Sequence, residues 1–307
     1  MDQYRLDGVR IGAGGFTNIT RDHLDYHATF ERYLAAKMRL FESLVAAGGP
    51  AVLNADAEHW QDFATAATRG GLKVLTVGEQ GDFIKLVERV PRSDGQTLKL
   101  RHAGSGSEVE LKLAGLFQAS NVLVAAGIAI ALGDDARRVF SALRNLRGAP
   151  GRLELMARTG DNAPVYVDYA HTPDALETVL RALRPHTRGR LHVLFGCGGN
   201  RDKGKRPMMG AIACQLADNV IVTDDNPRDE DAETIRREVL TGCPGAVEVG
   251  DRREAVRAAV ASLKADDVLV LAGKGHEENQ IIKGVSHPFS DRVEAVQAAI
   301  AQGGHAA

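Results

Sequence analysis

Four consecutive residues carry the chemistry that is easiest to interpret in this chain. They are Asp225, Asn226, Pro227 and Arg228, and they follow residues 219–223, an apolar run typical of a buried strand. In open α/β sheets, ligands bind just outside the carboxyl ends of the strands. A carboxylate pairs with an ammonium group, and a guanidinium binds a carboxylate through two parallel hydrogen bonds. Proline fixes φ and stiffens the loop. The segment therefore predicts a site for a ligand with both an amine and an acid, such as an amino acid.

A glycine-rich, basic loop follows a second expected strand, residues 191–195. Residues 199–205 match the beginning of a phosphate-binding loop, G-x-x-x-x-G-K, but Arg206 stands where that loop needs Ser or Thr to hold Mg²⁺. The dinucleotide-binding fingerprint also fails, because Arg201 occupies a position that requires a small residue. We expect a flexible turn suited to anionic groups, with a solvated basic loop as the alternative. Its basic residues are Arg201, Lys203, Lys205 and Arg206.

Three further side chains are candidates for a site, and each has a plainer interpretation. Glu277 follows the expected strand 267–271 at the same sheet edge, where it can accept an ammonium group or simply be a surface carboxylate. His23 lies in the polar segment 17–27 and can bind a metal or a phosphate, although a lone histidine more often forms structural hydrogen bonds. Lys37 lies in a helical stretch with many apolar neighbours, and by pattern alone its stem covers apolar surface while its ammonium group reaches water.

Composition excludes several classes of protein. The 307 residues contain 38 Lys and Arg against 40 Asp and Glu, a net charge of −2, so no basic field indicates nucleic acid as a partner. The first residues lack the apolar core of a signal peptide, and no segment is long and apolar enough to span a bilayer. The 3 cysteines have no C-x-x-C spacing, which argues against a disulfide framework and a structural zinc site. We expect a cytoplasmic protein without membrane or nucleic-acid partners.

The second half of the chain alternates strand-like and helical segments. Apolar strands that alternate with amphipathic helices indicate a parallel sheet covered on both faces. The expected strands are residues 165–168, 191–195, 219–223 and 267–271, and the expected helices are residues 173–183, 208–216, 232–240, 252–263 and 291–301. This half is therefore predicted to be a doubly wound, Rossmann-like α/β domain. The glycines and proline of residues 148–151 mark a linker, which predicts domains at residues 1–149 and 150–307.

The first half is less regular but is also predicted to be α/β. Helices are expected at residues 29–47, 118–132 and 135–146, and strands around a further helix at residues 51–54 and 73–77. Residues 83–90, 97–101 and 108–113 are expected to form short antiparallel strands, because turn residues separate them.

The order and spacing of several segments resemble those of the Mur ligases. The resemblance extends over essentially the whole chain and rests on residues 17–27, 33–37, 168–174, 196–207, 225–228 and 273–277. It implies an incomplete central ATPase domain, lacking a phosphate-binding loop, followed by a Rossmann-like amino-acid-binding domain. Asp-Asn-Pro-Arg at residues 225–228 is similar to the version found in members that select meso-2,6-diaminopimelate. That ligand has a second amino acid centre, whose carboxylate an arginine recognises and lysine lacks.

The resemblance also implies roles for individual residues. The implied diaminopimelate site consists of Arg201, Asp225, Asn226, Pro227, Arg228, Gly273 and Glu277. Gln3 and Arg5 match positions that touch the UDP-muramoyl dipeptide, and Asn121, Arg152 and Asp168 match ATP contacts. Lys37 matches a catalytic lysine that is carbamylated in this family, and the resulting anion can hold Mg²⁺ together with His23.

The implied activity is that of a carbon–nitrogen ligase of peptidoglycan synthesis. ATP, with Mg²⁺, phosphorylates the free γ-carboxylate of UDP-N-acetylmuramoyl-L-alanyl-D-glutamate, and the amine of meso-2,6-diaminopimelate displaces phosphate from the acyl phosphate. Positioning and neutralisation of charge carry such a phosphoryl transfer.

The sequence also departs from the family, and two other functions stay open. Family members have an N-terminal domain for the UDP moiety and a phosphate-binding loop ending in Gly-Lys-Thr or Gly-Lys-Ser, and neither occurs in these 307 residues. We therefore expect an N-terminally truncated ligase that is inactive alone. The first alternative is a non-catalytic amino-acid-binding fragment. The second is a nicotinamide-dependent oxidoreductase, which needs a complete G-x-G-x-x-G and an acidic residue about 20 positions later; the sequence lacks this pair.

Overall fold

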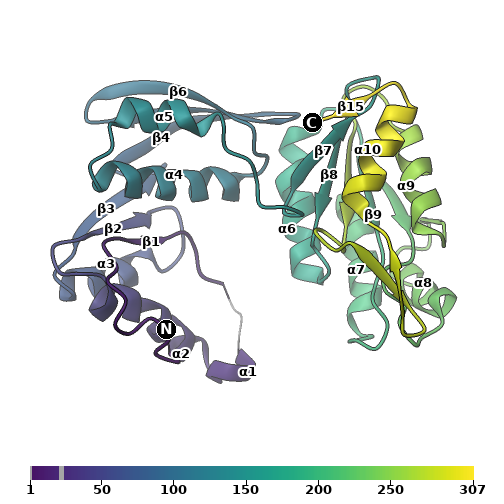
Figure 1. The fold of residues 1–307 in the computed structure, drawn as a ribbon, viewed down its shortest axis with the longest axis horizontal. Coiled ribbons are helices and arrows are strands. Elements are labelled where there is room, and N and C mark those ends of the chain that lie inside the picture. The colour runs from purple at the N-terminus through teal and green to yellow at the C-terminus, as the bar shows by residue number, and fades with distance from the viewer. Residues whose placement is uncertain (1, 21–23) are drawn as a thin grey trace. The chain divides into compact units, whose positions relative to one another are not determined.

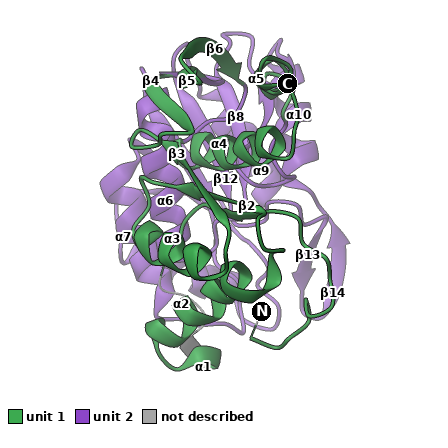
Figure 2. Cartoon of the chain, turned by 90° about the vertical axis from the view of Figure 1, so that its left-hand side faces the viewer, with its two compact units in different colours: residues 1–90, 97–111, 116–146 green, residues 91–96, 112–115, 147–307 purple. Residues whose placement is uncertain are grey.

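The chain forms two compact units, each with its own sheet (Figures 1 and 2). The structure, a computed structural model, describes residues 2–20 and 24–307. Unit 1 comprises residues up to 90 together with 97–111 and 116–146, and unit 2 comprises residues 91–96, 112–115 and 147–307. The main division thus falls at residues 146–147, beside the expected linker. Residues 91–96 and 112–115 lie in the first half of the chain but belong to unit 2, and no sequence pattern predicted this.

Unit 1 is built on a 6-stranded sheet with the order β1-β2-β3-β4-β5-β6. Its strands are Gly14–Phe16 (β1), Pro50–Asn54 (β2), Lys73–Gly78 (β3), Ile84–Arg92 (β4), Gly95–His102 (β5) and Ser105–Leu111 (β6). The first four strands pair in parallel. Tight turns at residues 93–94 and 103–104 join the last three, and such short connections require antiparallel pairing. The expected antiparallel strands are therefore present.

Helices cover both faces of this sheet. They are Leu24–His27 (α1), Phe30–Arg39 (α2), Trp60–Arg69 (α3), Leu116–Ala131 (α4) and Ala136–Leu143 (α5). Successive strand residues point to opposite faces. A Cβ added to Gly14 would lie 2.9 Å from the Phe41 ring, whereas one added to Gly15 would lie 2.8 Å from Val124 of α4. The segment around Phe41 thus packs closely on one face and α4 on the other.

The helix expected over residues 29–47 ends earlier than predicted. α2 begins after Thr29, whose side chain accepts a hydrogen bond from a backbone N–H of the first turn, and ends at Arg39. A π-helical turn, Leu40–Leu44 (η1), follows and is closed by a hydrogen bond from Val45 N to Leu40 O at 3.0 Å. Val45 is then extended and forms a parallel β-bridge with Ile11. The chain therefore leaves the helix after Leu44 and continues as extended backbone beside Ile11.

Unit 2 contains a 7-stranded sheet with the order β11-β10-β9-β12-β8-β7-β15. Its strands are Glu154–Arg158 (β7), Pro164–Asp168 (β8), Leu191–Phe195 (β9), Asn219–Val222 (β10), Val247–Glu248 (β11), Val268–Ala272 (β12) and His305–Ala306 (β15). β8 to β12 are parallel, and β7 and β15 pair antiparallel at one side. The predicted doubly wound α/β sheet is therefore confirmed. β8, β9 and β12 are buried along their whole length, which explains their continuous apolar sequences.

The helices of unit 2 form two layers. They are Pro173–Leu183 (α6) with the 3₁₀ turn Arg184–His186 (η2), Lys205–Leu216 (α7), Ala232–Leu240 (α8), Arg252–Ala261 (α9) and Asp291–Ala301 (α10). α6, α7 and α8 pack against one another in sequence, and α9 packs against α10. The chain moves outward from β8 through β9 and β10 to β11 and then returns to place β12 between β9 and β8. This reversal puts the switch point of the sheet, where ligands of such folds bind, beside β12.

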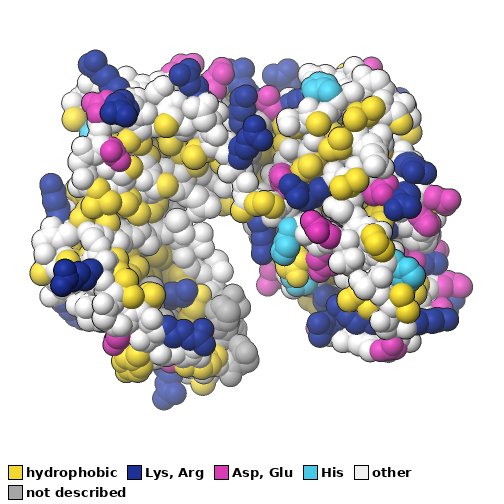
Figure 3. All heavy atoms as spheres, viewed as in Figure 1, with side chains coloured by type: hydrophobic (Ala, Val, Ile, Leu, Met, Phe, Trp, Pro, Cys, Tyr) yellow, Lys and Arg dark blue, Asp and Glu magenta, His cyan; other side chains and the backbone are white. Residues whose placement is uncertain are grey.

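A hairpin that the sequence did not predict lies between β12 and α10. Its strands, Asn279–Ile282 (β13) and Val285–Pro288 (β14), pair antiparallel through a turn at residues 283–284. No helix in the described part of the chain has both the length and the apolar character needed to cross a bilayer. On the face drawn in Figure 3, basic and acidic side chains are interspersed, in keeping with the net charge of −2.

Candidate functional site

Loops of unit 2 that carry half of the predicted site residues meet at one edge of the sheet. β8, β12, β9 and β10 are adjacent and parallel, so the loops after their carboxyl ends lie side by side. These loops contain Arg201 after β9, the segment 225–228 after β10, and Gly273 with Glu277 after β12. Asp168 is the last residue of β8. The fold therefore places side chains from distant parts of the sequence at the edge where ligands bind.

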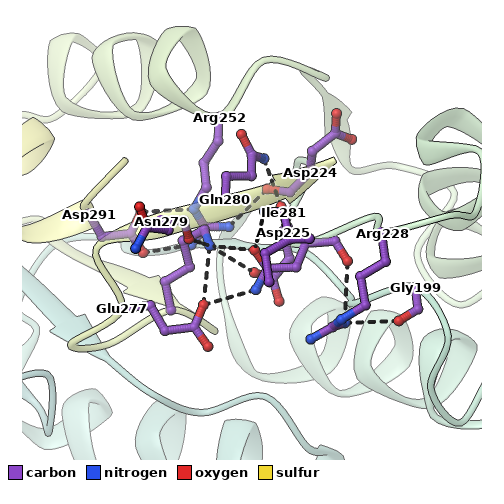
Figure 4. Close-up of polar contacts among 12 residues, drawn as sticks. Gly199, Asp224, Asp225, Arg228, Arg252, Glu277, Asn279, Gln280, Ile281 and Asp291 are labelled. Carbon is purple, nitrogen blue, oxygen red and sulfur yellow. Dashed lines mark hydrogen bonds and ion pairs between the residues drawn. The ribbon is translucent and has the colours of Figure 1, made fainter. Parts of the chain in front are cut away.

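Asn226 connects the loop after β10 to the loop after β12. Its neighbour Asp225 and its partners Glu277 and Ile281 are labelled in Figure 4. Its Nδ2 donates to Glu277 Oε2 at 2.9 Å. Its Oδ1 accepts hydrogen bonds from the backbone N–H of Ile281 and from the Lys274 ammonium, both at 3.0 Å. Because donors meet the oxygen and an acceptor meets the nitrogen, the orientation of the amide is fixed. Asn226 therefore holds the Glu277 carboxylate in place next to the buried Asp225.

Asp225 presents a buried carboxylate that the protein leaves partly unsatisfied. The residue is 8% exposed, and its Oδ1 accepts no hydrogen bond from the described residues. The Lys274 ammonium lies 3.5 Å from that oxygen. A Cβ added to Gly273 would lie 3.8 Å from Asp225 Oδ2, so the glycine keeps this oxygen uncovered. A buried carboxylate of this kind favours an ammonium group as its ligand.

Lys274 is a central residue of this edge that the sequence did not identify as a site residue. Its side chain is fully buried, and its ammonium group donates to Asn279 O at 2.8 Å and to Glu277 Oε2 at 3.3 Å, as well as to Asn226. Gly273 and Gly275 on either side both have positive φ. The signal for it was a lysine between two glycines directly after a buried strand.

Arg228 is fixed by its backbone but keeps part of its guanidinium available. Its φ of 53° lies in the left-handed region, which a residue other than glycine adopts at a cost of about 1–2 kcal/mol. The β13–β14 hairpin compensates, because Arg228 N donates to Ile281 O at 3.0 Å and Arg228 O accepts from Lys283 N at 2.7 Å. Nη1 donates to Gly199 O at 2.9 Å. Nε and Nη2 donate to none of the described residues, so they can bind a carboxylate.

The basic loop after β9 is less available to anions than the sequence suggested. Arg201 is exposed. Arg206, in contrast, is fully buried, and its guanidinium binds Glu230 at 3.0 Å and Glu238 at 2.7 Å. Lys205 Nζ donates to a backbone carbonyl at 2.7 Å. The prediction that Arg206 suits anionic groups was wrong, because α7 begins at Lys205 and directs Arg206 into the protein. For Lys205, which is half-buried, it stays a prediction.

Arg206 instead joins the loop after β9 to the loop after β10. Glu230 accepts two hydrogen bonds from Arg206 and one from the backbone N–H of Asn200. The hydrogen bonds from Arg206 lower the pKa of Glu230 to about 2. These contacts of Arg206 and Glu230 hold the segment that contains Gly199, whose carbonyl oxygen accepts a hydrogen bond from Arg228.

A second buried arginine supports the site. Arg252 and Asp291 are both fully buried and form two hydrogen bonds, at 2.8 and 2.7 Å. Arg252 also donates to Ala272 O, the last residue of β12, at 2.9 Å and to Asp224 O, two residues after β10, at 3.3 Å. Figure 4 labels Arg252, Asp291 and Asp224. The pair therefore fixes the two strand ends from which the site loops begin.

Asp168 and Arg152, which the resemblance associated with ATP, lie near one another in unit 2, because Asp168 accepts a hydrogen bond from the residue that follows Arg152. Asp168 Oδ2 accepts from Leu153 N at 2.6 Å and Oδ1 from Ala170 N at 2.7 Å. Burial raises the pKa of Asp168, although these hydrogen bonds oppose the shift. The Arg152 guanidinium is exposed and lies 4.9 Å from the centre of the Tyr169 ring.

The remaining predicted residues belong to unit 1. A cavity of about 380 Å³ is lined by Asp2, Gln3, Arg5, Tyr26, His27, Tyr33, Ala36 and Lys37. It brings together Gln3, Arg5 and Lys37, and it adds His27, which we had not singled out. Lys37 is exposed, and its Nζ lies 5.4 Å from the centre of the Tyr33 ring. Asn121 is exposed on α4. His23 lies outside the described residues, within which no cluster of three or more His, Cys, Asp and Glu side chains is suited to a metal ion.

Comparison with known proteins agrees with this division into two units. Residues 1–129 match the family model of the Mur ligase middle domain, and residues 151–275 match that of the Mur ligase glutamate ligase domain. Together the two matches cover most of the chain.

Individual relatives are similar over nearly all of this chain. The UDP-N-acetylmuramoyl-L-alanyl-D-glutamate--2,6-diaminopimelate ligase of Caulobacter vibrioides is 57% identical over 298 residues, which are 97% of this chain and 61% of the relative. The ligase of the same name from Agrobacterium fabrum is 54% identical over 98% of this chain and 62% of the relative. A solved structure of a ligase of this name superposes with a TM-score of 0.76, at 38% identity, over 98% of this chain and 63% of that one. The chain thus spans about 61–62% of the length of these curated relatives. It belongs to the Mur ligase family, of which it contains the middle and glutamate ligase domains.

Proposed function

We propose that unit 2 is the amino-acid-binding domain of a ligase that adds meso-2,6-diaminopimelate to UDP-N-acetylmuramoyl-L-alanyl-D-glutamate in peptidoglycan synthesis. One observation carries this proposal. The partly available guanidinium of Arg228 and the carboxylates of Asp225 and Glu277 lie in loops at the same edge of the sheet. The names of the relatives from Caulobacter vibrioides and Agrobacterium fabrum support the same ligand.

The distal end of diaminopimelate matches these groups one by one. Its ammonium group pairs with Asp225 and Glu277, and Gly273 leaves Asp225 Oδ2 uncovered for that contact. Its carboxylate binds Nε and Nη2 of Arg228, the two donors that the described residues do not use. The exposed Arg201 offers a second cation from the next loop. Pro227, which is buried, stiffens the loop between the two ends of the ligand.

The proposed reaction leaves the proximal amine of the ligand free to attack. ATP transfers its γ-phosphoryl group to the γ-carboxylate of the D-glutamate, and the amine then attacks the acyl carbon and expels phosphate. Mg²⁺ supplies neutralisation of the phosphate charge when it is bound. In unit 1 we assign the UDP-muramoyl dipeptide to Gln3 and Arg5, and the metal to His23 and a carbamylated Lys37. The shared cavity of Gln3, Arg5 and Lys37 supports this assignment.

The ATP contacts that we propose are Asn121, Arg152 and Asp168. Asp168 also accepts a backbone N–H group on each carboxylate oxygen, so besides contacting ATP it fixes the chain around Ala170 and Leu153. The side chains of Asn121 and Arg152 are exposed and can therefore bind a nucleotide. In the cell we place the protein in the cytoplasm, where these substrates are made.

We further propose that these 307 residues do not turn over ATP by themselves. Gly-Lys occurs before Arg206 and before Gly275, and in neither place does Thr or Ser follow to hold Mg²⁺. The chain alone then acts as an amino-acid-binding fragment. ATP hydrolysis stimulated by the dipeptide and diaminopimelate in a preparation of this chain would contradict the statement.

Titration calorimetry with meso-diaminopimelate and L-lysine tests the proposed ligand. A charge-assisted, bidentate contact contributes about 1.5–3 kcal/mol, so wild type should bind diaminopimelate roughly 10- to 150-fold more tightly than lysine. Arg228→Ala should remove the preference. Arg257→Ala, an exposed arginine of α9, is the matched control and should keep it. Equal affinities of the wild type for the two amino acids would refute the proposed specificity.

A further inference from the structure

The candidate site contains two carboxylates, but a buried lysine between them lowers its net negative charge. Asp225 and Glu277 contribute two negative charges. Arg252 and Asp291 beneath them form a buried pair that cancels. The Lys274 ammonium lies 3.5 Å from Asp225 Oδ1 and 3.3 Å from Glu277 Oε2, so the group of three has one net negative charge.

Neutral groups of the protein itself hold the Lys274 ammonium in this position. Its two shortest hydrogen bonds go to neutral oxygens, Asn279 O at 2.8 Å and Asn226 Oδ1 at 3.0 Å. A buried ammonium group requires such partners, because removing it from water is unfavourable. The Phe289 ring centre, 6.0 Å from Nζ, closes another side. An incoming ligand ammonium therefore meets a cation that is already fixed and that is not displaced.

Without Lys274 the site would have different preferences. Two carboxylates and nearby amide and carbonyl oxygens form a donor set that hard divalent cations favour. The same two charges would also favour a ligand with two positive charges over a zwitterion. The lysine occupies the position between the carboxylates and removes one charge, and this leaves room for a single ammonium group.

We propose that Lys274 is a specificity-determining residue that sets the net charge of the site to match one ammonium group. It thereby makes the site select the zwitterionic centre of an amino acid and reject diamines and divalent cations. Arg228 balances the carboxylate of that same centre. The inference rests on the proposed function of this edge of the sheet and adds the residue that excludes competing cations.

The test compares Lys274→Met and Lys274→Gln with wild type for three probes. The probes are meso-diaminopimelate, 1,5-diaminopentane and CaCl₂, and binding is followed by calorimetry and by the backbone amide NMR signals of residues 273–281. Gln keeps a donor for Asn226 Oδ1 and Asn279 O without a charge, so it serves if Met perturbs folding. Lys264→Met, at an exposed lysine of unit 2, is the matched control.

Wild type and the control should prefer diaminopimelate to the diamine and should not respond to Ca²⁺ at the site. Both Lys274 variants should lose this preference by at least tenfold and should bind Ca²⁺, with shifts of the signals of residues 273–281. A folded variant with an unchanged preference and no Ca²⁺ response would overturn the inference. If wild type binds no diaminopimelate but the variants gain Ca²⁺ binding, the charge-setting role stands and the proposed function fails.

Discussion

Removal of the Arg252 guanidinium is the perturbation whose cost the structure defines most clearly. In Arg252→Met the side chain keeps a similar length, so little empty space results. Asp291, which is fully buried, then loses both of its hydrogen bonds to Arg252. The carbonyl oxygens of Ala272 and Asp224 lose a donor as well. The dominant cost is an unpaired buried carboxylate at the base of the candidate site.

Breaking a buried ion pair by removing one partner costs about 3–5 kcal/mol. Because domains are stable by only about 5–15 kcal/mol, this is a large fraction of the stability of unit 2. It corresponds to a roughly 100- to 5,000-fold rise in the population of the open state. The double variant Arg252→Met/Asp291→Leu should recover more than half of the loss, since no buried charge is left unpaired.

Hydrogen exchange with mass spectrometry is the suitable assay, because it reports each unit separately. Peptides from β12 and α9 should exchange faster in Arg252→Met by that factor, while peptides from β2 and α3 of unit 1 serve as the internal reference. Arg257→Met, on the exposed side of the same helix, should change the free energy of unfolding by less than about 0.5 kcal/mol. The reasoning is refuted if the single variant loses under about 1 kcal/mol, or if the double variant is as unstable as the single one.

Two further predictions concern the loops and helices around the site. Arg206 holds the pKa of Glu230 at about 2, below its ordinary 4.5, so the ionised carboxylate stabilises the fold above pH 4.5 and this contribution is lost as pH falls toward 2. With the Glu230 side chain 19% exposed, we expect the contribution to be about 2 kcal/mol. Urea unfolding of wild type and Glu230→Gln should therefore differ at pH 7, approach one another as the pH falls from 4.5, and converge only below pH 2; a constant difference contradicts this. A Cβ at Gly210 would lie 2.2 Å from Val239 O, so Gly210→Ala should separate α7 from α8 and lower the free energy of unfolding by about 1–3 kcal/mol, as measured by thermal unfolding. Gly245 has open space around it, so Gly245→Ala is the control and should cost less than about 0.5 kcal/mol. Equal costs for the two variants would be evidence against the close contact.

The sheet of unit 2 was predictable because its strands are buried on both faces. β8, β9 and β12 appear in the sequence as unbroken apolar runs, and the loops after them then follow from the parallel arrangement. The residue types of Asp225 and Arg228 at the end of β10 led to the prediction of a ligand with an amine and an acid, and that ligand stays a prediction. The geometry adds that Arg228 keeps two donors unused by the described residues.

Other parts of the site could not be predicted, because they depend on tertiary neighbours. The residues of β14 are all exposed and those of β13 are exposed or half-buried, so the hairpin that fixes Arg228 has no hydrophobic pattern. Lys274 is buried although lysine is almost always exposed, and its partner Asn226 is distant in sequence. Arg206 resembled a ligand-binding cation because its partner Glu230 cannot be identified from spacing.

A crystal structure of this chain with meso-diaminopimelate tests the central claim most directly. The account predicts that the distal carboxylate of the ligand binds Nε and Nη2 of Arg228, and that the distal ammonium group lies within hydrogen-bond distance of Asp225 Oδ2 and of Glu277. Lys274 should keep its contacts with Asn226 and Asn279 in that complex. A ligand bound elsewhere, or with its distal carboxylate away from Arg228, would contradict the account.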